Sequence, residues 1–128
     1  MTTRIITMTN RPPVQINDED WEVIAEASGD SFAGNDYGRR QQALGQGECD
    51  RYTLKVRQHD DGERVIVSGV FDAASAWTGK EDIRGGILLK SPSASDIVRA
   101  IREVGEYCHL PDRIIRDCIA DMPAEELT

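Results

Sequence analysis

The chain has 128 residues, of which 39% are hydrophobic and 30% are charged, and its net charge at pH 7 is −8. This length is typical of one domain, so we expect residues 1–128 to form a single domain, and the recurring apolar runs disfavour a disordered chain. A negative field repels phosphate backbones, which disfavours broad binding to nucleic acids and to anionic membranes.

The cysteines and the N-terminus indicate where the protein resides. Three cysteines, at positions 49, 108 and 118, have no paired spacing. An odd, unpaired set disfavours a disulfide framework and favours a reducing compartment. The first residues lack the apolar core of a signal peptide, and no apolar run is long enough to span a bilayer. We therefore expect a cytoplasmic protein.

The N-terminal part contains a predicted strand and a predicted helix. Residues 4–8 form a short β-branched run typical of an edge strand. Asn17 is placed to cap a helix over 18–28, and Asp18 to Asp20 put negative charge in its first turn. Helical spacing continues through Trp21, Ile24, Ala25 and Ser28, and Gly29 is suited to the C-terminal end.

A β-hairpin is the clearest pattern in the chain. Apolar and polar residues alternate over 51–58, and Asp61-Gly62 offers a two-residue type I′ turn before a returning strand over 63–71. That turn pairs Val56 with Val67, Tyr52 with Phe71, and Arg51 with Asp72.

The C-terminal part contains a predicted strand and two predicted helices. The strand covers 86–90, and Ser93 or Ser95 caps the first helix, whose buried stripe comprises Ile97, Ile101, Val104 and Cys108. Pro111 begins the last helix, whose apolar face comprises Ile114, Ile115, Cys118, Ile119 and Met122. The predicted fold class is α+β, with a small antiparallel sheet centred on a hairpin at about 51–71 and covered by an N-terminal helix and a C-terminal helical hairpin.

Catalytic and metal-binding motifs are missing from the sequence. There is no G-x-S-x-G nucleophile turn and no phosphate-binding glycine loop, so we lean away from an enzyme and expect no cofactor. Cys108-His109 and Cys118 lack zinc-ligand spacing and are better explained by helix packing, and His59-Asp60-Asp61 is better explained by turn chemistry, so no metal is expected. A helix-turn-helix function is disfavoured because the last helix carries three acids, Asp112, Asp117 and Asp121, against two bases, Arg113 and Arg116.

The feature that most favours a function is an acidic run with no Lys or Arg between Pro12 and Gly38. A solubilising face is its simplest explanation, but the run would also dock onto a basic protein partner. With the glycine-rich loop 29–50, it gives the predicted partner-binding residues Asp18, Glu19, Asp20, Glu22, Glu26, Asp30, Tyr37, Arg39 and Arg40.

Two other functions and a dimer stay open. An enzyme site between loops 29–50 and 73–86 would use Tyr37, Arg39, Arg40, Trp77 and a carboxylate such as Asp72. Nucleic-acid binding would use the basic face of the hairpin, formed by Arg51, Lys55, Arg57 and Arg64. A free hairpin edge would also allow a homodimer by strand pairing.

Residues 36–80 carry a resemblance. The segments Asp36-Tyr37-Gly38-Arg39-Arg40, Cys49-Asp50-Arg51-Tyr52 and Ala76-Trp77-Thr78-Gly79 resemble short, largely uncharacterised proteins of conjugative plasmids and other bacterial mobile elements. The resemblance implies an accessory or inhibitory factor that binds host or competitor proteins, and it transfers no catalytic residue.

Overall fold

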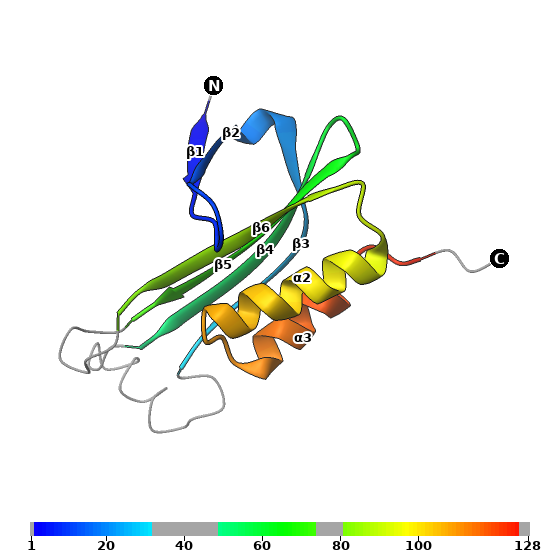
Figure 1. Cartoon of the computed structure of the whole chain (residues 1–128). Helices are drawn as coiled ribbons and strands as arrows, with labels where there is room; N and C mark the ends of the chain where they lie inside the picture. The colour runs from blue at the N-terminus through cyan, green and yellow to red at the C-terminus, as the bar shows by residue number, and fades with distance from the viewer. Residues whose placement is uncertain (1, 32–48, 74–80, 126–128) are drawn as a thin grey trace.

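The computed structural model describes residues 2–31, 49–73 and 81–125, which form an α+β fold (Figure 1). Its elements in chain order are β1 (Thr3–Ile6), β2 (Val14–Asn17), the 3-10 turn η1 (Asp18–Asp20), β3 (Trp21–Asp30), β4 (Arg51–His59), β5 (Arg64–Asp72), β6 (Ile83–Lys90), α2 (Ala94–Tyr107) and α3 (Asp112–Ala120). No helix in these ranges is long and apolar enough to cross a membrane.

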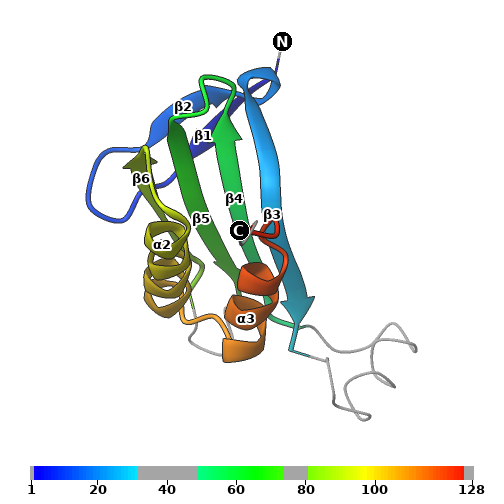
Figure 2. The ribbon, with the colours of Figure 1, turned by 90° about the vertical axis from the view of Figure 1, so that its right-hand side faces the viewer.

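The architecture has three layers. The central layer is a four-stranded antiparallel sheet with the order β3-β4-β5-β6. Helices α2 and α3 pack on one face of this sheet, and the separate β1–β2 hairpin crosses the other face near the β4–β5 turn (Figures 1 and 2). The two helices thus cover one face of the sheet, and the β1–β2 hairpin covers part of the other (Figures 1 and 2).

The predicted N-terminal helix over 18–28 is wrong, and with it the predicted cover of the sheet. Residues 18–20 form the single turn η1, and β3 pairs with β4 over its whole length. A β-bulge between Val23 and Ala25 interrupts the alternation of side chains in β3. The sheet is larger than expected, and only the C-terminal helices cover its apolar face.

The predicted hairpin register is confirmed. Val56 pairs with Val67, Tyr52 with Phe71, and Arg51 with Asp72. The type I′ turn is wrong, because such a turn needs positive φ at both central residues and only Gly62 has it, at 75°. The Gly62 N–H donates to the His59 carbonyl over 2.9 Å, which closes the turn one residue earlier.

The C-terminal elements are also confirmed. Strand β6 includes the predicted 86–90 but begins at Ile83. Helix α2 is capped by Ser93, whose side chain and backbone exchange hydrogen bonds with Asp96, and these bonds lower the pKa of that carboxyl group. Pro111 stands at the cap position of α3 and not at its first helical residue.

Two apolar clusters hold the layers together. The larger lies between the helices and the sheet, and its fully buried members include Leu54, Val67, Ile101 and Ile114. The smaller lies under the β1–β2 hairpin and comprises Ile6, Met8, Ile16 and Ile66. Burial on both faces explains why β5 reads as an almost continuous apolar strand.

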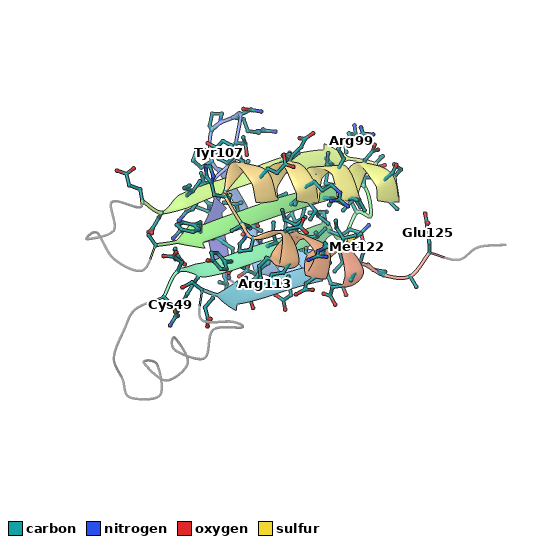
Figure 3. The ribbon with its side chains drawn as sticks, turned by 90° about the horizontal axis from the view of Figure 1, so that it is seen from below. Cys49, Arg99, Tyr107, Arg113, Met122 and Glu125 are labelled. Atoms are coloured by element: carbon teal, nitrogen blue, oxygen red, sulfur yellow. The ribbon has the colours of Figure 1, made fainter. Side chains whose placement is uncertain are left out.

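Neither edge of the four-stranded sheet is bare. On β3, the Glu26 N–H donates to the Asp121 carboxylate over 2.9 Å. Arg113 of α3, which is labelled in Figure 3, donates to the Asp30 carbonyl over 2.6 Å. On β6, the Gly86 carbonyl accepts the Thr9 N–H over 2.9 Å. The β4–β5 hairpin has no free edge of its own, since β3 and β6 flank it.

Candidate functional site

The predicted acidic residues do not share one helix face, because most of them lie on a strand. Glu22 is paired with Gln58, on the helix side of the sheet. Glu26 and Asp30 lie on the opposite side, where their cross-strand neighbours are Lys55 and Arg51. Glu26 and Asp30 are thus adjacent to cations. The acidic residues without a cationic cross-strand neighbour lie closer to η1.

The acids of η1 also help to attach the N-terminal strand. Arg4 donates from Nε and Nη2 to the two Asp18 carboxylate oxygens over 3.0 and 3.1 Å. These bonds hold the pKa of Asp18 below its usual range. The Glu19 carboxylate accepts the Thr2 N–H over 2.6 Å. Asp18 therefore has a structural role, and its charge is not free for a partner.

A recess forms where η1 meets the β4–β5 turn, and we call it the acidic recess. Its volume is about 210 Å³, and it is lined by Glu19, Asp20, Trp21, Glu22, Gln58, His59 and Asp60. The Asp60 N–H donates to the Asp20 carbonyl over 2.9 Å, which ties the turn to η1. The segment around η1 contributes Glu19, Asp20 and Glu22, and the β4–β5 turn contributes Asp60. Two segments far apart in the sequence thus bring four acidic residues to one recess.

The aromatic wall of the acidic recess is fixed by packing. The rings of Trp21 and His59 meet edge to face with their centroids 4.9 Å apart, and the Arg64 guanidinium lies 5.7 Å from the Trp21 centroid. Asp61 pairs with Arg64 over 2.9 Å. The Glu63 N–H is the strongest influence on the Asp61 carboxylate and, with Arg64, lowers its pKa well below the usual range. Arg64 is thereby neutralised, and the remaining carboxylates dominate the charge of the recess.

The chemistry of the acidic recess is suited to a cation. Carboxylates accept charge-assisted hydrogen bonds from guanidinium and ammonium groups. Glu22 and Asp60 are exposed, with 63% of the Asp60 side chain open to solvent. Within residues 2–31, 49–73 and 81–125, no group of three or more His, Cys, Asp and Glu side chains is placed to hold a metal ion.

The sequence interpretation found part of this site. It included Glu19, Asp20 and Glu22 but assigned His59 and Asp60 to turn chemistry alone. The missed signal was the pairing of Trp21 with His59 across β3 and β4, which places the hairpin turn beside η1. A helix over 18–28 could not pair with β4, so the prediction of a helix hid this contact.

The other predicted residues are distributed as follows. Tyr37, Arg39, Arg40 and Trp77 lie outside the described residues. Asp72 ends β5 and pairs with Arg84 over 3.3 Å. The residues that flank 32–48 and 74–80 lie at one end of the sheet, because Asp30, Arg51 and Asp72 are consecutive neighbours across three strands. A recess of about 430 Å³ at this end is lined by Asp50, Tyr52, Phe71, Glu81, Ile83 and His109.

The basic face of the hairpin is not an open cationic surface. Arg51 is flanked by Asp30 and Asp72, and Lys55 is flanked by Glu26. Arg64 is paired with Asp61, as described above, and Arg57 is buried. Binding the extended phosphate backbone of a nucleic acid needs several cations that project freely from the surface, so this arrangement gives a nucleic-acid function little support.

Two of the cysteines belong to the main core. Cys108 and Cys118 are fully buried, and burial raises the pKa of each thiol to about 11, with Asp121 and Glu26 adding to the effect at Cys118.

We expect both buried cysteines to resist a thiol reagent at pH 8 until the protein unfolds, because the thiolate is the reactive form. Cys49 is partly exposed and should react first. Counting labelled thiols in the native and urea-unfolded protein checks this; three fast thiols in the native protein would contradict it.

Comparisons with known proteins gave no match to a family model, to a curated protein or to a solved structure. No residue role can be transferred to the acidic recess from a relative. Its function has to be inferred from the side chains that line it.

Proposed function

We propose that this chain is a non-enzymatic binding protein that docks onto a basic segment of a protein partner through the acidic recess. One observation carries the proposal: Asp60 from the β4–β5 turn joins Glu19, Asp20 and Glu22 in the lining of one recess, beside the Trp21–His59 pair. Four acidic residues that line one recess with two aromatic residues suit an Arg or Lys side chain presented by a partner.

The proposal includes the setting that the resemblance of residues 36–80 implies. The partner would be a host or competitor protein in the bacterial cytoplasm, and binding would inhibit or redirect it. The net charge of −8 supports this, since complementary fields accelerate association with a basic protein. Buried thiols at Cys108 and Cys118 suit a reducing compartment.

Affinity capture with three matched baits tests the proposal. The first bait is the wild-type protein, and the second carries Glu22→Lys and Asp60→Lys in the acidic recess. The third carries Glu103→Lys and Glu106→Lys, two exposed positions on α2 that give the same change in net charge. Each bait is incubated with nuclease-treated bacterial lysate, and the retained proteins are quantified by mass spectrometry.

The proposal predicts a basic protein that the wild-type and α2 baits retain and the recess bait loses. Equal retention by all three baits would contradict a role for the acidic recess. Loss from both variants would show that net charge alone drives binding. Empty lanes for every bait would contradict the binding function itself.

A further inference from the structure

A second groove lies on the face of the sheet that the helices do not cover. Its lining residues come from the β1 segment and from β4, β5 and β6, on the face of the sheet that the N-terminal hairpin crosses (Figure 1). Its volume is about 120 Å³, and its polar lining comprises Arg4, Thr7, Arg57, Ser68 and Arg84. We call it the arginine groove, because three cations line it in a protein whose net charge is −8.

Arg57 at the base of the arginine groove is buried without a counter-ion. The residue is 6% exposed, and its Nη1 donates to the Ser68 Oγ over 3.0 Å. In the described part of the chain, no carboxylate lies within ion-pair distance of its guanidinium. Burial lowers the pKa of Arg57 and the positive charge of Arg4 lowers it further, while the more distant carboxylates of Asp18 and Glu26 offset part of this effect. Buried charges in proteins are normally paired, so this one is missing a partner.

The other two arginines stand at the mouth of the groove. The Arg4 side chain is 48% exposed and paired with Asp18, and the Arg84 side chain is 53% exposed and paired with Asp72. Arg4 and Arg84 each have a carboxylate at ion-pair distance, whereas among the described residues the buried Arg57 has none. Arg4 bonds Asp18 through Nε and Nη2, and Arg84 bonds Asp72 through Nη2, so the guanidinium N–H groups outside these pairs can donate to a group that enters.

We propose that the arginine groove binds a small oxyanion, a carboxylate or a phosphate group, with Arg57 as the buried countercharge and Arg4 and Arg84 closing over its exposed side. Planar guanidinium groups match the oxygens of both anions, and Ser68 and Thr7 add hydroxyl groups nearby. The site lies apart from the acidic recess, with which it shares no lining residue, so it goes beyond the proposed function.

Thermal unfolding tests the proposal with inorganic phosphate and acetate as separate probes, each balanced with NaCl to constant ionic strength. At ten times the dissociation constant, a ligand shifts the folding equilibrium about elevenfold and raises the Tm by roughly 4–6 °C for a chain of this size. We expect the wild-type Tm to rise, and the more effective probe identifies the group that the arginine groove prefers.

Arg57→Met removes the buried charge and keeps the apolar stem. Its Tm in buffer without either probe should equal or exceed that of the wild type, since an unpaired buried charge is destabilising, and neither probe should raise it. Arg51→Met, an exposed arginine on the same face, should keep the wild-type response. An equal rise in Arg57→Met, or no rise in the wild type with either probe, would overturn the proposal.

A second variant and a second readout keep the test decisive if Arg57→Met does not fold. Arg84→Gln changes a half-exposed side chain and should weaken the affinity for the effective probe about fivefold or more, as for the loss of one charge-assisted hydrogen bond. Amide chemical shifts recorded during the wild-type titration should move at Thr7, Ser68, Gly69 and Gly85, which line the arginine groove. Shifts confined to other surfaces would refute the site.

Discussion

Replacing Ile101 with Ala is expected to lower the free energy of unfolding by about 2–5 kcal/mol. Ile101 lies in the middle of α2 and is fully buried between that helix and the sheet. Its loss removes apolar contacts and leaves a cavity that helices packed on a sheet cannot close completely. Urea unfolding followed by circular dichroism measures the change.

The matched control is Ile5→Ala. Ile5 is on β1 and is 71% exposed, so the same chemical change should alter the free energy of unfolding by less than about 0.5 kcal/mol. Equal effects at Ile101 and Ile5 would show that α2 does not pack on the sheet in the way described.

Replacing Gly105 with Ala is expected to destabilise the protein by about 1–3 kcal/mol, although Ala is the better helix former. Gly105 lies inside α2 where α3 crosses it, and a Cβ there would come within 2.5 and 2.6 Å of Ile115 Cγ1 and Cδ1. Ile115 is itself only 6% exposed, so it has little room to move. The steric cost should exceed the gain of about 1 kcal/mol in helix propensity.

The cause of that loss can be isolated with Ile115→Ala, which removes both clashing atoms. In the Ile115→Ala background, Gly105→Ala should be neutral or stabilising by up to about 1 kcal/mol, because only helix propensity remains. Chemical denaturation of the four proteins in this cycle gives the coupling energy. A stabilising effect of Gly105→Ala in the wild-type background would contradict the close approach of α2 and α3.

The sequence was sufficient to predict those elements whose signals agree with one another. In the hairpin, alternation at Tyr52 and Val56, an Asp-Gly turn and opposite charges at Arg51 and Asp72 all require one register, and that register is observed. In α2, the Ser93 cap and the apolar stripe likewise predict the same helix. The predicted turn type is wrong because the observed turn is closed by the bond from the Gly62 N–H to the His59 carbonyl, and of the two expected central residues only Gly62 has positive φ.

The helix predicted for 18–28 is wrong because a β-bulge gives the apolar residues of this strand the spacing of an amphipathic helix. Ile24 and Ala25 both contact the main core even though they are adjacent, since the bulge rotates the chain between them. With Trp21, they give the i, i+3, i+4 spacing of an amphipathic helix. The segment forms a strand because it pairs with the edge of β4. Leaving the backbone N–H and C=O groups of that edge unpaired would cost more free energy than the weak helix propensity of residues 18–28 provides.

Both proposed binding surfaces depend on contacts that no local pattern reveals. The acidic recess needs the β4–β5 turn beside η1, and the arginine groove needs β1 across the sheet above Arg57. From alternation alone, Arg57 belongs to a solvated basic face, whereas the N-terminal hairpin covers it. Such contacts between distant segments follow from the tertiary fold and not from the residues on either side.

The fluorescence of Trp21 tests the central claim, that the acidic recess binds a basic segment. The chain has two tryptophans, so Trp77→Phe leaves Trp21 as the single indole. Titration with a short peptide of Arg and Ser should give a saturable change in emission that a peptide of Glu and Ser does not produce. Glu22→Lys with Asp60→Lys should weaken binding about tenfold or more, while Glu103→Lys with Glu106→Lys should have a much smaller effect. Identical titration curves for all three proteins would contradict the acidic recess as the binding site.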